Sequence, residues 1–430
     1  MIPIYDFDQV SPEEIFSWET DRADVSGAVA AIIADVRQNG DSALLRYARD
    51  FDHAELTAVE VPREAMEAAA LGLDSGLRAV MEEAAANIRD FHRRQRRESF
   101  VVSEKDGVIL GQKITPIEKV GLYIPGGTAA YPSSVLMNAI PAKLAGCREI
   151  VMVSPPTCGG DVNPAILAAA YIAGVDRVFR CGGAQAVAAL AYGTETVPRV
   201  DKIVGPGNAY VAEAKRQVFG QVAIDMIAGP SEILVVADGK SNPKWVAADL
   251  LSQAEHDKMA SAVLVTDDMA LARAVQAEIE RQLPALPRAD IARASIDNHG
   301  KIIVTPDLLR ALDVANQLAP EHLELCVDQP FDYLAKVRNA GSIFLGRSCP
   351  EALGDYLAGP NHTLPTSGTA RFSSPLSVDD FVKKSQFTYY TAAALEAVQG
   401  KIAAFARQEG LEAHARSAEI RFETEGGDER

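Results

Sequence analysis

Two polar side chains, one helical turn apart, close the amphipathic stretch DLLSQAEHDK at residues 249–258. Gln253 and His256 are three positions apart, so on a helix they share one face and could meet the same ion. Asn242 is suited to cap the start of this helix, with a proline following it in the first turn. Most pairs of this kind are ordinary surface features, so a metal site would need further ligands.

A second candidate group is the Glu321–His322 pair in APEHLELCVD. The alternating leucines that follow predict a strand, and consecutive strand residues point to opposite faces. The two side chains therefore converge only if Pro320 and the preceding turn distort the backbone. If they converge, a carboxylate beside an imidazole is a general-base pair that works near neutral pH. The alternative is a polar strand start without catalytic meaning.

Two further stretches could supply the missing ligands. GDYLAGPNHTLPT (354–366) is a loop by its glycine and proline content and carries Asp355 and His362. Ordered loops of this kind often serve sites, although turn formation alone also explains them. EGLEAHARS places Glu409 and His414 in a terminal helix. They are five positions apart, so both reach one site only if the helix breaks near Gly410.

Three glycine-rich segments, YIPGG, CGGAQ and GPGNAY, stand where a strand leads into a helix. In open parallel sheets such strand ends form the ligand crevice, and the helix N-termini there favour phosphate. None of the segments is a complete G-x-G-x-x-G, and glycine there is often only a tight turn. Together they make a nucleotide site plausible.

The elements that must position these residues alternate in type. The first hundred residues are mainly helical in pattern, whereas β-rich runs ending in glycine or proline then lead into helices, as in βαβ units. The expected strands fall in two series, at 119–127, 148–156, 175–183 and 200–208, then at 231–238, 261–268, 301–307 and 342–346. We therefore expect two α/β domains of similar size with parallel sheets, an arrangement that a duplication would explain. The last fifty residues return to an amphipathic helical pattern that must pack on this chain or on a second subunit.

Composition narrows the functional class. The 430 residues carry a formal net charge of −17, which argues against nucleic acid or an anionic membrane as the main partner. Apolar runs do not approach the length of a membrane span, and the opening stretch does not have the pattern of a signal peptide. Five scattered cysteines without a C-x-x-C pair are typical of reduced, mostly buried thiols in a cytoplasmic protein.

Taken together, the motifs resemble one family. GLYIPGG, GGAQAVAALAYGTETVPRVDKIVGPGNAYVAEAKRQV, AGPSE, DLLSQAEHD, PEHLEL, GDYLAGPNHTLPT and AHARSAEIR are similar to segments of histidinol dehydrogenase, the last enzyme of histidine biosynthesis. The resemblance covers nearly the whole chain and is closest from about residue 115 to residue 420. The N-terminal helices are less distinctive.

The resemblance implies an α/β fold with two incomplete Rossmann-like domains, at 106–230 and 231–375. It also implies an N-terminal helical region (1–105) packing on the second domain, and a helical tail (376–430) crossing to the partner of a homodimer. The reaction would be the four-electron oxidation of L-histidinol to L-histidine through bound L-histidinal, with two NAD+ and one zinc ion per subunit.

The implied site residues follow from the same motifs. Glu321 and His322 would be the catalytic acid–base residues. The zinc ligands would be Gln253, His256, Asp355 and His414, the last donated by the partner chain. The substrate would be surrounded by Ser231, Gln253, His256, His322, Asp355, His362, Glu409 and His414. The NAD+ contacts would be Tyr123, Gln185 and Asn208.

Three other functions stay open on the sequence. A zinc hydrolase would use the same ligands, but this function would not explain the three glycine-rich strand ends. A noncatalytic, metal-stabilised oligomer would make Glu321 and His322 dispensable. A related dehydrogenase could oxidise another polar alcohol.

Overall fold

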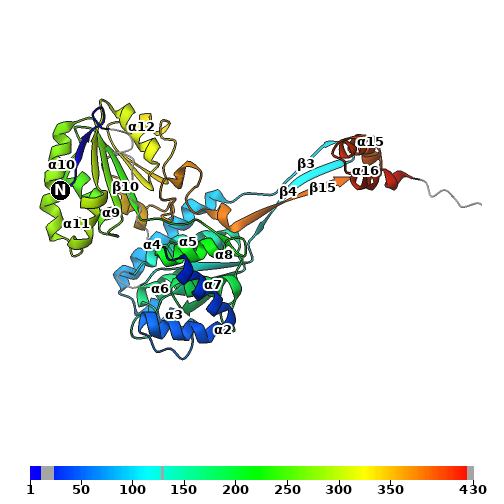
Figure 1. Ribbon diagram of the computed structural model, residues 1–430, viewed down its shortest axis with the longest axis horizontal. Coiled ribbons are helices and arrows are strands. Elements are labelled where there is room, and N and C mark those ends of the chain that lie inside the picture. Colours follow the sequence, from blue (N-terminus) through cyan, green and yellow to red (C-terminus); the bar gives the residue numbers. More distant parts are fainter. Residues whose placement is uncertain (11–23, 127–129, 424–430) are drawn as a thin grey trace, which may run out of the picture. The chain divides into compact units, whose positions relative to one another are not determined.

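The computed structural model describes residues 1–10, 24–126 and 130–423. Two compact units make up the chain (Figure 1). The first comprises Met1–Arg96 and Ile117–Phe381 and contains both parallel sheets; the second comprises Arg97–Pro116 and Val382–Arg430.

The first sheet has the strand order β2-β7-β6-β5-β8-β9. Its strands are β2 (Glu60–Val61), β5 (Lys119–Tyr123), β6 (Glu149–Ser154), β7 (Arg177–Arg180), β8 (Lys202–Val204) and β9 (Ala223–Ile224). All pairs are parallel except β2 with β7. The helices between its parallel strands are α5 (Pro132–Ala145), α6 (Pro164–Ala173), α7 (Gly183–Tyr192) and α8 (Ala209–Val218). Counting from β5, the parallel strands follow the 3-2-1-4-5 order of a Rossmann-like sheet.

The second sheet has the order β1-β12-β11-β10-β13-β14 and is parallel throughout. Its strands are β1 (Ile4–Asp6), β10 (Glu232–Ala237), β11 (Ser261–Thr266), β12 (Lys301–Val304), β13 (His322–Cys326) and β14 (Ser342–Leu345). Its helices are α9 (Pro243–Ala254), α10 (Met269–Gln282), α11 (Ala289–His299), α12 (Leu308–Leu318), α13 (Pro330–Leu334) and α14 (Glu351–Tyr356). Counting from β10 yields the same 3-2-1-4-5 order, so the two sheets share one topology.

Both sheets are buried on both faces. In the first sheet, Leu122 and Met152 belong to one hydrophobic core, whereas Val151 and Val153 belong to the core on the opposite face. The second sheet is likewise covered by two cores. Burial of both faces explains why these strands are nearly continuous apolar runs rather than alternating ones.

The N-terminal helices correct one expectation. They are α2 (Ser26–Asp52), α3 (Arg63–Gly72) and α4 (Ser75–His92), and they pack on α7, α6 and α5 of the first α/β domain (Figure 1). The prediction placed this region on the second domain, but α2 and α3 pack on helices of the first, whereas α4 contacts both, since Asn87 donates to the Leu357 carbonyl at 2.9 Å. Within the described residues, the segment around β1 joins the second sheet. Periodicity identifies an apolar helix face, but it does not identify the sheet that receives that face.

The second unit contains more than a helical tail. Strands β3 (Phe100–Lys105), β4 (Val108–Pro116) and β15 (Val382–Tyr390) form an antiparallel sheet of order β15-β4-β3. Helices α15 (Ala392–Gln408) and α16 (Glu412–Glu419) pack on each other through small side chains, namely Ala403, Ala406 and Ala415. The sequence did not predict these three strands, because their side chains are mostly exposed and show no clear apolar pattern.

Short 3-10 helices complete the described chain: η1 (Arg93–Gln95), η2 (Leu283–Ala285), η3 (Thr369–Arg371), η4 (Val378–Phe381) and η5 (Ile420–Phe422). Among the described helices, none combines the length and apolar character that a membrane span needs. The five cysteines are all free, and three of them are buried as expected, Cys147, Cys181 and Cys326.

Candidate active site

Glu321 and His322 stand at the amino end of β13, beside the amino end of β10. The residue before Pro320, Ala319, adopts a left-handed conformation with φ 51°. This turn supplies the backbone distortion on which the convergence of the pair depends. Glu321 Oε2 lies 3.7 Å from His322 Nδ1. The carboxyl group and the imidazole therefore share one buried environment.

The hydrogen bond of His322 selects its tautomer. His322 Nδ1 lies 2.9 Å from the carbonyl oxygen of Glu232, the first residue of β10. Because a carbonyl can only accept, Nδ1 carries the proton and Nε2 keeps its lone pair. Burial lowers the pKa of His322 to about 4, against a smaller opposing effect of nearby Asp355. His322 is thus a neutral imidazole whose open nitrogen can accept a proton.

The Glu321 carboxyl group is held by the same strand end. Its Oε2 accepts a hydrogen bond from the Glu232 backbone N–H at 3.0 Å. Burial raises the pKa of Glu321 well above its ordinary value, and surrounding carboxylates act in the same direction. A carboxylate with a raised pKa is a stronger proton acceptor once it is ionised. Ser231 directly precedes this strand end, and its carbonyl accepts from Ser261 N at 3.0 Å.

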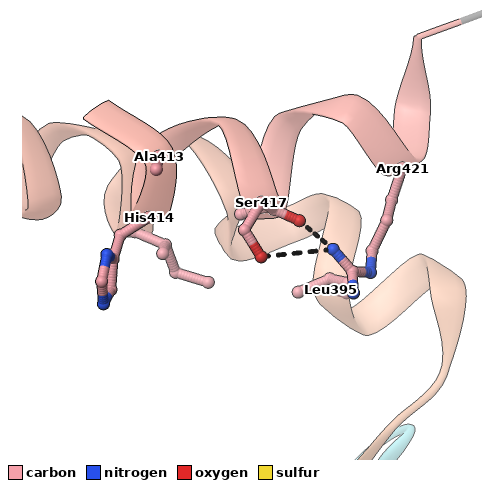
Figure 2. A pocket seen from close by; sticks show the side chains of 7 residues that line it. Leu395, Ala413, His414, Ser417 and Arg421 are labelled. Carbon is pink, nitrogen blue, oxygen red and sulfur yellow. Dashed lines mark hydrogen bonds between the residues drawn. The ribbon is translucent and has the colours of Figure 1, made fainter. Parts of the chain in front are cut away.

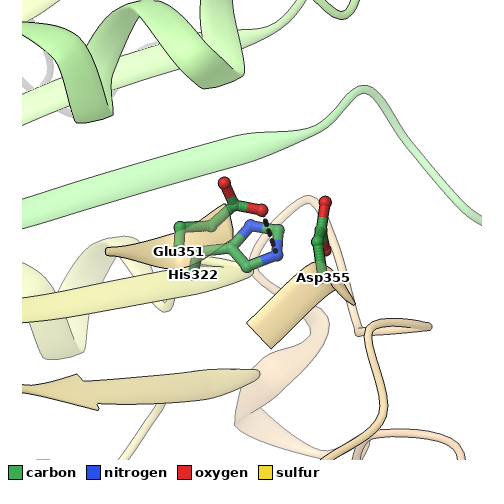
Figure 3. A group of neighbouring side chains, drawn as sticks. All are labelled: His322, Glu351 and Asp355. Atoms are coloured by element: carbon green, nitrogen blue, oxygen red, sulfur yellow. Dashed lines mark ion pairs between the residues drawn. The ribbon is translucent and has the colours of Figure 1, made fainter. Parts of the chain in front are cut away.

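A third acidic residue near His322 was missed in the sequence. Glu351 and Asp355 lie one turn apart on α14, and Glu351 Oε1 is 3.7 Å from His322 Nε2 (Figure 3). Possible ligand atoms of His322, Glu351 and Asp355 all lie within 4.8 Å of one another. The i,i+4 spacing of the two acids was a signal, but Glu351 resembled a surface residue until the fold buried it.

The two carboxyl groups of α14 differ in charge. Burial and the charge of Asp355 raise the pKa of Glu351, so Glu351 holds its proton. Burial also acts to raise the pKa of Asp355, but the hydrogen bond and charge of His362 outweigh it and lower the value. Asp355 is therefore the ionised member, the state that a metal ligand needs.

The loop that carries His362 is anchored on helices of the first α/β domain. His362 Nδ1 lies 3.3 Å from Asp355 Oδ1, and its Nε2 lies 3.1 Å from the hydroxyl of Ser134 on α5. The neighbouring Asn361 donates to the Met137 carbonyl at 2.7 Å. Sequence reasoning did not find Ser134, because this contact joins residues more than two hundred positions apart.

Gln253 and His256 end helix α9, which Asn242 caps by accepting from Lys244 N at 3.0 Å. Gln253 is 1% exposed, and both its amide oxygen and its amide nitrogen lack a hydrogen-bond partner among the described residues. A buried amide without partners is unfavourable by roughly 1–3 kcal/mol, so it points to a missing ligand. Burial lowers the pKa of His256, and the charge of Asp355 opposes that effect, so the two side chains interact electrostatically.

Glu409 and His414 belong to the second unit. Helix α15 ends at Gln408 and α16 begins at Glu412, and Gly410 between them adopts φ 75°. The helix therefore breaks near Gly410, as it must if Glu409 and His414 are to reach one site. His414 lines a pocket of the tail together with side chains of α15, α16 and η5 (Figure 2). These are Leu395, Ile402, Ala413, Ser417, Ala418 and Arg421. The meeting of Glu409 and His414 with the residues of the first unit stays a prediction.

The three expected NAD+ contacts lie at the carboxyl edge of the first sheet. Tyr123 ends β5, Gln185 stands in the first turn of α7, and Asn208 caps α8 by accepting from Val211 N at 3.2 Å. The Tyr123 hydroxyl accepts from Gly183 N at 3.0 Å, and burial raises its pKa, so the phenol keeps a proton to donate.

The same edge of the second sheet has a different character. Asp238 follows β10 and Asp328 follows the end of β13, and both pair with Arg347, at 2.6 and 2.7 Å. An edge already occupied by carboxylates and their own cation is a poor site for a phosphate. The predicted acid–base pair lies at the opposite, amino edge of this sheet.

Comparisons with known proteins agree with one another. A family model described as histidinol dehydrogenase matches residues 17–422. The chain is 59% identical over 396 residues to a histidinol dehydrogenase of Geobacillus kaustophilus, covering 92% of this chain and 93% of the relative. It is 58% identical over 406 residues to one of Syntrophotalea carbinolica, covering 94% of each. A solved histidinol dehydrogenase of Elizabethkingia anophelis superposes with a TM-score of 0.92 at 38% identity, covering 98% of each chain.

Proposed function

The chain belongs to the histidinol dehydrogenase family, and from this premise we propose that it oxidises L-histidinol to L-histidine through bound L-histidinal, reducing two NAD+. The single observation that carries the chemistry is the buried pair of Glu321 and His322, with the Nε2 lone pair of the imidazole open. An oxidation of an alcohol needs a proton acceptor at this place, and a neutral imidazole is one.

In the first oxidation, His322 Nε2 accepts the proton of the substrate hydroxyl while hydride leaves the same carbon for NAD+. The Nδ1–H bond to the Glu232 carbonyl keeps the ring oriented, because the proton on Nδ1 is already engaged. The resulting imidazolium lies close to Glu351 and Asp355, and the Asp355 carboxylate offsets its charge. The products of this step are the bound aldehyde and NADH.

In the second oxidation, water adds to the aldehyde carbon and the hydrate loses a second hydride to a second NAD+. Glu321 accepts a proton from the water, which its raised pKa favours once the carboxyl is ionised. His322, once it has released its first proton to solvent, then accepts the proton of a hydrate hydroxyl as it did in the first step. The carboxylic acid product accounts for the oxygen taken from water and for four electrons in total.

The residues present fit a zinc ion. The proposed ligands are Gln253, His256, Asp355 and the partner subunit's His414. The unpartnered, buried amide of Gln253 is the observation that supports the fit, and an ionised Asp355 together with His256, whose pKa burial lowers, is a suitable donor set. When bound, zinc would orient the substrate through its imidazole and amine nitrogens. Ser231, His362 and Glu409 would complete the substrate contacts, together with Gln253, His256, His322, Asp355 and His414.

We place NAD+ at the carboxyl edge of the first sheet, against Tyr123, Gln185 and Asn208. The strand order supports this position, because ligands of open α/β sheets bind where the order reverses, here between β5 and β8. The carboxylates at the same edge of the second sheet disfavour a second dinucleotide there.

We propose a homodimer whose sites are shared through the tail. The tail carries Glu409 and His414 and exposes large apolar side chains. Phe405 is 71% exposed, and Ile402, Leu411 and Ile420 are also exposed. A helix pair with this much apolar surface needs a partner surface to cover it.

One assay tests the reaction and its cofactors. We expect about two NADH per L-histidinol consumed, and loss of turnover when a chelator removes zinc. His322→Asn and Glu321→Gln should remain folded with little activity, whereas His299→Asn, at the end of α11, should retain full activity. Turnover of an ester or amide without NAD+, or full activity of His322→Asn, would contradict the proposal.

Mixing two inactive variants tests the shared site. A dimer of one His414→Ala subunit and one His322→Asn subunit has one intact site if His414 acts across the dimer. Random reassortment should therefore restore roughly a quarter of wild-type activity, because half of the dimers are mixed and each has one good site. Absence of any restored activity, with subunit exchange verified by mass, would show that His414 acts within its own chain.

A further inference from the structure

Asp52, the last residue of α2, lies at the carboxyl edge of the first sheet. His53 adopts φ 54° and turns the chain away from the helix. The segment that follows runs beside the ends of β6 and β7. A Cβ on Gly160, in the loop after β6, would be 3.3 Å from Leu56, and the Val59 carbonyl accepts from Arg180 N at 2.7 Å. Asp52 therefore joins the edge that carries the dinucleotide contacts.

The surroundings of Asp52 are unfavourable for a carboxylate. Its Oδ2 is buried and has no hydrogen-bond partner among the described residues. It also sits at the carbonyl pole of α2, where the helix dipole disfavours negative charge. Burial raises the pKa of Asp52 to about 6, and its charge acts on Tyr123 and Cys181, which stand at the ends of β5 and β7. A group so placed is explained by a ligand that donates hydrogen bonds to it.

The chemistry at this edge narrows the ligand to a polyhydroxyl group. A carboxylate accepts hydrogen bonds and repels phosphate, whereas the vicinal hydroxyls of a ribose offer two donors. In dinucleotide-binding sheets, an acidic residue near the end of the second strand usually accepts from the ribose. Here the second strand, β6, ends in Ser154, and two prolines follow, so that position carries no acid. Asp52 lies at the same carboxyl edge of the first sheet, but it belongs to helix α2 and not to the end of β6.

We propose that the Asp52 carboxylate binds the adenosine ribose hydroxyls of the dinucleotide co-substrate, and that it selects NAD+ over its 2′-phosphorylated counterpart. The inference rests on the proposed NAD+-dependent oxidation and adds the residue that determines cofactor specificity. The observation that supports this inference is the buried Oδ2 of Asp52 at the carboxyl edge, which has no hydrogen-bond partner among the described residues. A 2′-phosphate would bring a second negative charge against this carboxylate.

The first experiment compares Asp52→Asn and Asp52→Ala with Asp50→Asn. Asp50 is a matched control, since it lies two residues away and its exposed side chain pairs with Arg49 at 3.0 Å. Loss of a hydrogen bond to a charged acceptor should raise KM for NAD+ about tenfold or more. The preference for NAD+ over NADP+ in kcat/KM should fall by a similar factor. Zinc content, KM for L-histidinol and the behaviour of Asp50→Asn should stay unchanged.

The second experiment removes the hydroxyl instead of the acid. Wild-type enzyme should have a KM for NAD+ lacking the adenosine 2′-hydroxyl that is about tenfold higher than for NAD+, and this difference should vanish in Asp52→Ala. The comparison of the two dinucleotides in the wild-type enzyme remains informative even if a variant folds poorly. Equal KM values for both dinucleotides in wild-type enzyme that turns over L-histidinol would overturn this inference alone. Failure of wild-type enzyme to reduce NAD+ would instead refute the proposed function.

Discussion

Replacing Lys215 with methionine should expose the energetics of a buried ion pair under the proposed NAD+ edge. The side chains of Lys215 and Asp225 are 2% and 1% exposed and form an ion pair. Both also hold Gly205: Lys215 Nζ donates to its carbonyl at 3.0 Å, and Asp225 Oδ2 accepts from its N–H at 2.7 Å. The pair therefore fixes the backbone three residues before Asn208.

The expected magnitude follows from the burial. Lys215→Met leaves the Asp225 carboxylate desolvated and without its cation, which typically costs about 3–5 kcal/mol. The added change Asp225→Asn should recover at least about 1 kcal/mol of this, because it removes the unpaired charge while keeping an oxygen for Gly205 N–H. Lys240→Met is the matched control. Its exposed pair with Asp328 should contribute less than about 1 kcal/mol.

The assay is guanidinium unfolding of the four proteins, followed by NAD+ titration of the steady-state rate. The KM for NAD+ should rise in Lys215→Met, since the segment leading to Asn208 loses its anchor, while KM for L-histidinol changes little. A loss below about 1 kcal/mol in Lys215→Met, or a double variant less stable than the single one, would refute the reasoning from buried charge.

Three further predictions concern single positions. Gly205→Ala should lower the melting temperature and weaken NAD+ binding, because a side chain is strained at φ 113° and its Cβ would lie 2.1 Å from the Tyr123 carbonyl oxygen; an unchanged KM for NAD+ would contradict this. Asn361→Ala should lower the free energy of unfolding by about 1–3 kcal/mol, since the bond to the Met137 carbonyl is buried, and should speed zinc loss to a chelator. For Asp52, the pKa in the folded chain is about 6, above the ordinary 3.8, so the folded state binds the proton more tightly and stability falls as pH rises from about 4 to 6. The melting temperature of Asp52→Asn should therefore exceed that of the wild type increasingly across this interval and level off above pH 6; a constant difference would count against the buried carboxylate.

Local features of the sequence predicted much of the fold. The β-rich runs predicted the strands from β5 to β8 and also β10, β11, β12 and β14, and the alternating leucines predicted β13, because turn residues and apolar patterns act over a few positions. The Asn242 cap and the break at Gly410 were readable for the same reason. The strand order and the docking of α2, α3 and α4 on the first domain were not, since any apolar helix face can in principle cover any sheet.

For the candidate site as well, the sequence identified some residues and not others. Residues in distinctive motifs, such as Gln253 and His256, could be selected from the sequence. Glu351, Ser134 and Asp52 could not, because each is an unremarkable residue type until distant segments bury it beside a particular partner.

The sequence by itself determined the strands and helices of the two α/β domains, the family and the residue types that could accept protons or bind metal, since these depend on local periodicity and on motifs. Only the tertiary structure decided which nitrogen of His322 is open, which of Glu351 and Asp355 is charged, and that the Gln253 amide has no partner within the described chain. The physical reason is that tautomer, ionisation and unmet hydrogen bonds depend on desolvation and on contacts between distant residues. Desolvation and these contacts arise only when the chain folds.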